Sequence, residues 1–84
     1  MFHVLLERAA EYDLARLALE IHDRVILAIR SLATNPRPPG CRKLAGSKGD
    51  WRIRVGDYRV VYEIADEIRV VRVHRVRHRR EVYR

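Results

Sequence analysis

The amino-acid sequence predicts one α+β domain, in which an N-terminal strand and a helical hairpin precede a small antiparallel sheet with the helices on one face. Three observations predict this class. The chain has 84 residues, too few to divide their apolar side chains between two cores. Apolar residues in its first half recur at three- and four-residue steps, as in an amphipathic helix. Those in its second half alternate with basic residues, as in half-buried strands. We therefore treat residues 1–84 as a single domain.

The first elements are a short strand and a helical region. Phe2 to Leu6 is apolar and β-prone, which predicts the strand. A continuous helix from Ala9 to Thr34 would span about 39 Å at 1.5 Å per residue, which is long for so small a domain. We therefore predict a break near Leu19 to His22, and an end at Asn35-Pro36, because proline disfavours a helical conformation in the preceding residue. The stripe predicted to face the core consists of Ala10, Leu14, Leu17, Ile21, Val25, Ala28, Ile29 and Leu32.

The C-terminal half predicts a three-stranded antiparallel meander. Trp51 to Val55 and Tyr58 to Ala65 alternate apolar with polar side chains, and Gly56-Asp57 between them suits a two-residue type II′ hairpin turn. Asp66-Glu67 can make a second tight turn into a third strand, Ile68 to Val76. Each strand then pairs with the next one along the chain.

The hairpin register separates apolar from basic side chains. With Gly56-Asp57 as the turn, Arg54 lies opposite Arg59, and side chains alternate between the two faces. The core face comprises Trp51, Ile53, Val55, Tyr58, Val60, Tyr62 and Ile64, joined by Val71 and Val73 of the third strand. The opposite face also carries Val61 and Glu63. Its cations, which define what we call the arginine face, are Arg52, Arg54, Arg59, Arg72 and His74.

The arginine face is the first candidate for a binding site. Like charges directly across a strand pair destabilise a sheet, so folding alone does not explain the Arg54–Arg59 pair. The chain carries 18 Lys and Arg against 11 Asp and Glu, a net charge of +7 that favours a polyanionic partner. We expect nucleic acid to contact Arg52, Arg54, Arg72 and His74, because guanidinium groups bind phosphate through paired donors. The alternative is a solvated polar face.

Other kinds of site are not expected. Cys41 is the only cysteine, so no disulfide can form within the chain, and a reducing cytoplasm fits this composition. The apolar start is too short for a signal-peptide core or a membrane span. His74, His78 and Cys41 lack the spacing of metal ligands, and the sequence has no Gly-rich phosphate loop. We therefore expect neither a metal nor a cofactor.

Three segments resemble the RelE-type toxins of the RelE/ParE superfamily, which belong to bacterial and archaeal toxin–antitoxin modules. They are Leu44-Ala-Gly46, Trp51 to Ile64, and His78-Arg-Arg-Glu-Val-Tyr83. The resemblance covers nearly the whole chain and is most specific in the hairpin and the C-terminal tail. It implies a metal-independent endoribonuclease that cleaves mRNA in the ribosomal decoding site and so inhibits translation. It also implies a cognate antitoxin protein as partner.

The resemblance further implies roles for individual residues. In RelE-like enzymes a ribose 2′-hydroxyl attacks the adjacent phosphate, which requires positive charge on the developing phosphorane and groups that take up and supply protons. By position in the motifs, Arg52 and Arg54 match a basic pair on the first hairpin strand. Arg59 and Arg79 match arginines expected to stabilise the transition state, and Tyr83 matches a tail tyrosine that contacts a base. We expect Arg59 to be exposed, so that its loss would leave the fold intact.

The general base and the exact activity stay open. Some relatives carry lysine where this chain has Arg52 and Arg54, and arginine, with a pKa above roughly 12, is a poor base. Histidine has an ordinary pKa of about 6.5, which makes His78 the first candidate base and His74 the second. One alternative function is inhibition of DNA gyrase, as in ParE-like chains, which generally lack this tail and basic hairpin. Another is an inactive relative that binds only RNA or its antitoxin.

Overall fold

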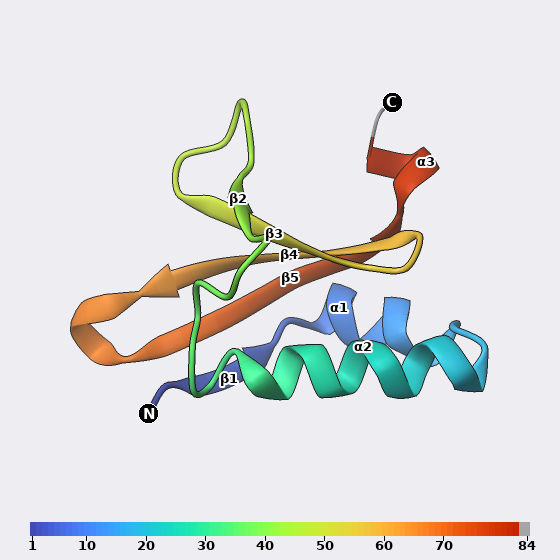
Figure 1. Ribbon diagram of the computed structural model, residues 1–84, viewed down its shortest axis with the longest axis horizontal. Helices are drawn as coiled ribbons and strands as arrows, with labels where there is room; N and C mark the ends of the chain where they lie inside the picture. The colour runs from blue at the N-terminus through green and yellow to red at the C-terminus, as the bar shows by residue number, and fades with distance from the viewer. Residues whose placement is uncertain (83–84) are drawn as a thin grey trace.

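The computed structural model describes residues 1–82, which form a five-stranded mixed sheet with two helices on one face (Figure 1). A short 3₁₀ turn, Asp66–Ile68, joins β4 to β5. The strand order across the sheet is β1-β5-β4-β3-β2. The elements in chain order are β1 (His3–Leu6), α1 (Arg8–Ala15), α2 (Leu19–Ser31), β2 (Arg42–Lys43), β3 (Asp50–Val55), β4 (Tyr58–Ala65), β5 (Val70–His78) and α3 (Arg79–Val82).

The predicted helical hairpin is confirmed. α1 ends at Ala15 and α2 begins at Leu19, so the break occupies residues 16–18, slightly before the predicted position. All eight residues of the predicted stripe are buried or packed against the core, and Val25 and Leu32 have no exposed surface. Complete burial of one such side chain contributes about 1.5–3 kcal/mol relative to exposure. The stripe is therefore what holds both helices against the sheet.

The β3–β4 hairpin has the predicted register. Val55 pairs with Tyr58 and Arg54 with Arg59. Gly56 has a positive φ of 59°, whereas φ of Asp57 is not positive. A type II′ turn requires this combination at its two central residues. Tyr62 is fully buried, and its hydroxyl donates a hydrogen bond of 2.7 Å to the carbonyl of Pro36. That bond fastens the proline-rich segment to the sheet.

The edges of the sheet differ from the predicted meander. β1 pairs in parallel with β5, with Val4 beside Val71, which makes the sheet mixed. β2 adds a two-residue strand at the other edge, antiparallel to β3. Neither pairing was predicted from the sequence, because both depend on where the helical hairpin and the proline-rich segment return the chain, and not on a local pattern.

The turn and the register between β4 and β5 also differ. The 3₁₀ turn is closed by Arg69 in the left-handed conformation, with φ 57°, so β5 begins at Val70 and not at Ile68. A β-bulge follows: Val61 lies opposite Arg75 but Tyr62 lies opposite Val73, which leaves His74 as the extra residue of β5. The bulge shifts the pairing of everything beyond it by one residue.

Candidate nucleic-acid interface

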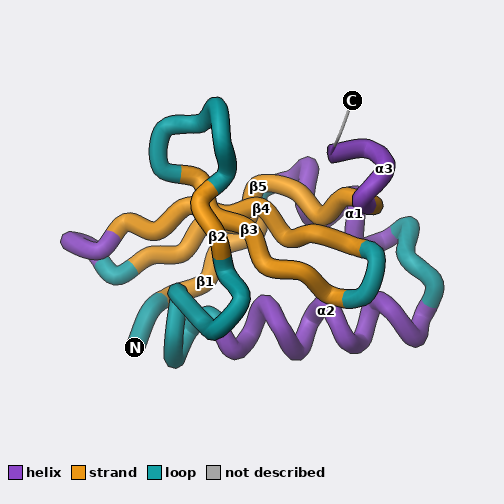
Figure 2. The backbone as a smooth tube through the Cα atoms, turned by 45° about the horizontal axis from the view of Figure 1, so that its top comes forward, coloured by secondary structure: helices purple, strands orange, loops and turns teal. Residues whose placement is uncertain are grey.

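The arginine face lies on the side of the sheet away from α1 and α2. The β2–β3 loop and α3 both rise on this side, in two views of the molecule (Figures 1 and 2). Arg52 and Arg54 come from β3, and Arg42 of β2 lies beside Arg52. The face therefore forms the floor of a region bordered by a loop at one end and the tail helix at the other.

A row of three arginines crosses the end of this face that lies next to the β3–β4 turn. Arg54 of β3 lies opposite Arg59 of β4, and Arg59 lies opposite Arg77 of β5. Only the β-bulge brings Arg77 into this row, because the unbulged register would have set Val76 beside Arg59. Arg77 was therefore not foreseen from the sequence. Like charges placed abreast across strands weaken a sheet, so the row has a cost for folding.

Arg59 is buried, with 4% of its surface exposed, and the expectation of an exposed side chain was wrong. Arg59 lies on β4, which has β3 on one side and β5 on the other. Its partner on β5, Arg77, lies two residues before the start of α3. Arg54, on the strand nearer the edge, is exposed. A buried charge interacts more strongly with its surroundings than an exposed one, because less water screens it. Replacement of Arg59 is therefore expected to change stability as well as charge.

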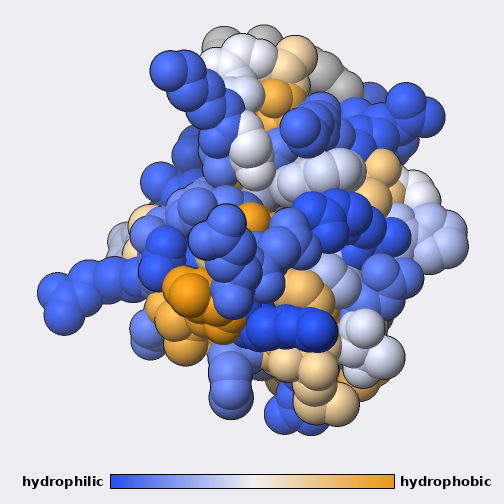
Figure 3. Space-filling model, turned by 90° about the vertical axis from the view of Figure 1, so that its left-hand side faces the viewer, coloured by the Kyte–Doolittle hydropathy of each residue, from blue (hydrophilic) through white to orange (hydrophobic). Residues whose placement is uncertain are grey.

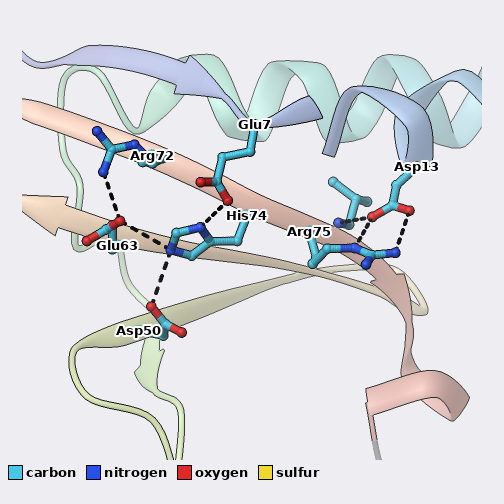
Figure 4. Close-up of polar contacts among 8 residues, drawn as sticks. Glu7, Asp13, Asp50, Glu63, Arg72, His74 and Arg75 are labelled. Carbon is cyan, nitrogen blue, oxygen red and sulfur yellow. Dashed lines mark hydrogen bonds and ion pairs between the residues drawn. The ribbon is translucent and has the colours of Figure 1, made fainter. Parts of the chain in front are cut away.

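The other end of the face is neutralised by carboxylates (Figure 4). Arg72 donates to Glu63 at 3.0 Å. The ring of His74 has Glu7 at 2.5 Å from Nδ1, and Asp50 and Glu63 each at 3.4 Å from Nε2. Arg72 and His74, both predicted to bind RNA, thus already have acidic partners. The arginine face is divided into this mixed end and a more basic end.

The tail residues lie around the basic end. Arg79 is exposed; its backbone N–H donates to the carbonyl of Asp57 at 2.7 Å, and its guanidinium lies 3.9 Å from the Asp57 carboxylate. His78 pairs with Tyr58, and their rings meet edge to face at 5.2 Å. Since Tyr58 belongs to the core face, the register sets His78 on that face and not among the arginines. Tyr83 lies outside the described residues.

Glu81 is a further residue of this end that the sequence did not indicate. Its carboxylate accepts hydrogen bonds from the backbone N–H of His78 at 3.2 Å and from Nε of Arg77 at 3.1 Å. These two contacts, the His78 amide first, hold the pKa of Glu81 below its ordinary value. An ionised Glu81 therefore offsets part of the charge of the arginine row.

A hollow of 440 Å³ opens where β2 stops pairing with β3. Arg42, Arg52 and Arg54 border it, together with residues of α2 and the segment Pro38-Pro39-Gly40. Its mixture of guanidinium groups and apolar walls suits an anion attached to a flat or apolar group. The hollow extends the basic end of the arginine face to the edge of the sheet.

Polar side chains dominate the surface seen from the left-hand side of Figure 1. Apolar side chains form only small patches in this view (Figure 3). Among residues 1–82, no group of three or more His, Cys, Asp or Glu side chains is arranged to hold a metal ion. No helix in that range is long and apolar enough to cross a membrane.

The fold and the basic face define a small toxin of the RelE/ParE superfamily. The family model described as the ParE toxin of the type II toxin–antitoxin system parDE matches residues 4–83, which is nearly the whole sequence. The chain belongs to this family, and is a toxin of a type II toxin–antitoxin system. No curated protein matches the sequence.

Solved structures of RelE and related toxins share the fold. A chain of the RelBE2 toxin–antitoxin complex from Mycobacterium tuberculosis is 29% identical, with a TM-score of 0.81, over 92% of this chain and 96% of that one. A chain of the archaeal RelE–RelB complex from Pyrococcus horikoshii is 24% identical, with a TM-score of 0.81, over 93% and 94%. The YoeB/ParE toxin from Agrobacterium tumefaciens is 19% identical, with a TM-score of 0.77, over 92% and 98%.

Proposed function

We propose that this toxin is a RelE-like endoribonuclease that cleaves mRNA in the ribosomal decoding site and so inhibits translation. The observation that carries the proposal is the row of Arg54, Arg59 and Arg77 across three adjacent strands. Arranging three like charges abreast is unfavourable for the sheet, and a phosphodiester bound over them would relieve that repulsion. The exposed Arg79 supplies a further cation from the tail.

The proposed reaction is a transesterification within the RNA. The 2′-oxygen forms a bond to phosphorus while the bond from phosphorus to the 5′-oxygen breaks. The proton of the 2′-hydroxyl passes to a base, and another proton is delivered to the departing 5′-oxygen. The products are a 2′,3′-cyclic phosphate and a 5′-hydroxyl. Negative charge grows on the non-bridging oxygens in the transition state, which is where guanidinium groups lower the barrier.

Arg59 is the residue best suited to that phosphate. Its burial limits screening by water, and fixed donors in such surroundings stabilise a developing charge more than mobile ones in solvent. Arg52 and Arg54 both border the hollow. Arg54 adjoins Arg59 in the row and is suited to the same phosphate, whereas Arg52 is suited to the neighbouring RNA backbone. Arg79 remains the second predicted clamp, and Tyr83 the predicted contact to a base. Phosphates at the other end of the face would have to compete with the carboxylate partners of Arg72 and His74.

A cognate antitoxin is the proposed protein partner. The solved relatives from Mycobacterium tuberculosis and Pyrococcus horikoshii are complexes of a RelE toxin with a RelB protein. Inhibition of DNA gyrase is the second candidate function, because the matching family model is that of ParE toxins. The two candidates differ in their target, and a single preparation of the toxin can be tested against both.

The test compares Arg54→Ala with Arg30→Ala, which removes the same charge from an exposed position on α2, across the sheet. Both changes should leave stability within about 0.5 kcal/mol. In a translating extract, with mRNA ends mapped by primer extension, Arg54→Ala should slow cleavage by about a hundredfold, the usual loss for one transition-state donor. Arg30→Ala should cut at the wild-type rate.

Supercoiling by DNA gyrase is measured on the same preparations. The proposal expects no inhibition by the wild-type toxin. Wild-type toxin that blocks supercoiling and leaves mRNA intact would establish the second candidate instead. Equal cleavage by Arg54→Ala and Arg30→Ala would remove the arginine row from the site.

A further inference from the structure

The start of α3 is held by reciprocal side-chain contacts that the proposed chemistry does not use. α3 begins at Arg79, so His78 occupies the N-cap position. Nδ1 of His78 accepts a hydrogen bond from the backbone N–H of Arg80 at 3.2 Å, the contact that an N-cap side chain makes with the second helical residue. Glu81, the third helical residue, accepts the backbone N–H of His78 at 3.2 Å. Together they form a capping box, with histidine in place of the usual serine or threonine.

The same segment is fastened to its surroundings on both sides. The N–H of Arg79 donates to the carbonyl of Asp57 in the hairpin turn at 2.7 Å, so three successive amides at residues 78–80 each have an acceptor. The His78 ring lies edge to face on Tyr58, and Glu81 also pairs with Arg77. A helix of four residues is not stable by itself. These contacts therefore set the direction in which the tail leaves the sheet.

The capping contact requires one particular form of the His78 ring. Nδ1 can accept the Arg80 N–H only in the neutral ring whose proton lies on Nε2. Neither nitrogen is then available as a base, since one accepts a hydrogen bond and the other already carries a proton. A second proton, on Nδ1, would make that nitrogen a donor facing the Arg80 N–H, which is also a donor. It would also add positive charge at a helix N-terminus.

We propose that His78 is a positioning residue: with Glu81 it caps α3, and so directs Arg79 and the rest of this helix toward the basic end of the arginine face. The effect on cleavage rests on the proposed nuclease function, whereas the cap itself does not. A general base at position 78 requires an imidazole. A cap requires only a short side chain with an acceptor, so the two roles predict opposite results for asparagine, a good N-cap residue.

The test uses His78→Ala, which has neither imidazole nor acceptor, and His78→Asn, which restores the acceptor alone. His22→Ala, on α2, is the matched control. Hydrogen exchange of the Arg80 amide should be faster in His78→Ala by about 2- to 30-fold, the range that corresponds to loss of an N-cap. It should be slow again in His78→Asn and unchanged in His22→Ala. ¹⁵N chemical shifts of the ring should show Nδ1 unprotonated in the wild type.

Cleavage of mRNA is then measured on the same variants. His78→Asn should recover most of the rate that His78→Ala loses. If asparagine restores slow exchange but not cleavage, the imidazole has a chemical role and the proposal is overturned. Unchanged exchange of the Arg80 amide in His78→Ala would overturn it too, whatever the activity. If the wild-type toxin cuts no mRNA, the nuclease function fails, while exchange and ring shifts still test the cap.

Discussion

The carboxylate of Asp13 joins α1 to β5 through three hydrogen bonds. Its side chain is 10% exposed, and it accepts hydrogen bonds from Nε and Nη2 of Arg75 at 2.9 and 3.0 Å and from the backbone N–H of Val76 at 2.9 Å (Figure 4). The bond to Asp13 is the main reason that the pKa of Arg75 lies above its ordinary value. We expect the packing of α1 on the sheet to depend on this residue.

The cost of losing this carboxylate follows from its three contacts. Asp13→Ala leaves the buried N–H of Val76 without its acceptor, which costs about 1–3 kcal/mol. Arg75 is 42% exposed and can regain water, so its lost ion pair adds only about 1 kcal/mol. We expect the free energy of unfolding to fall by about 2–4 kcal/mol. Asp13→Asn keeps one acceptor oxygen and should cost about half as much.

Urea and thermal unfolding of both variants provide the measurement. One kcal/mol corresponds to about 4–8 °C in Tm for a domain of this size, so Asp13→Ala should melt about 10 °C or more below the wild type. Asp23→Ala is the control, because its side chain is 68% exposed and its carboxylate lies 3.2 Å from Nδ1 of the neighbouring His22. If Asp13→Ala and Asp23→Ala have the same urea and thermal midpoints of unfolding, the Asp13 carboxylate does not hold α1 against β5.

Two further predictions concern a buried hydroxyl and the basic face. Burial raises the pKa of Tyr62 above its ordinary value of 10.0, so the stability from its protonated hydroxyl is complete below about pH 10 and is lost as pH rises further. Tyr62→Phe should lower the free energy of unfolding by about 1–2 kcal/mol at neutral pH. It should also remove the loss of stability at high pH that the Tyr62 hydroxyl causes. Urea unfolding of both proteins at pH 8 and pH 11 measures this, and identical pH profiles would contradict it. The logarithm of the RNA-binding constant should fall with the logarithm of the salt concentration, at a slope of about −0.7 per phosphate contacted. Binding isotherms at several salt concentrations measure this slope. If Arg54→Ala leaves it unchanged, Arg54 does not contact a phosphate.

Local patterns were sufficient to predict much of the fold. The apolar stripe predicted the two helices, and the Gly56-Asp57 turn predicted the hairpin register. Both features depend on residues that are close together in the chain. The parallel pairing of β1 with β5 was not predictable in this way, since it joins Val4 to Val71 across most of the sequence. Such contacts follow from packing of the finished domain.

The candidate site was predicted only in part, for a physical reason that centres on the bulge. An extra residue in β5 has no distinct sequence pattern here, yet it brings Arg77 beside Arg59 and sets His78 opposite Tyr58. Burial of Arg59 depends on its neighbours in space and not on strand alternation. The His78–Glu81 cap was also missed, because histidine is not among the residues that usually identify an N-cap.

The chemistry of the cut RNA ends tests the central claim most directly. Wild-type toxin would be added to a translating extract, and the new 5′ ends of the mRNA ligated to an adaptor with and without prior phosphorylation. The proposed attack of the 2′-oxygen predicts 5′-hydroxyl ends, which ligate only after phosphorylation, and matching 2′,3′-cyclic phosphates on the upstream fragments. New ends that ligate directly, and so carry a 5′-phosphate, or an mRNA that stays intact while translation stops, would contradict the account.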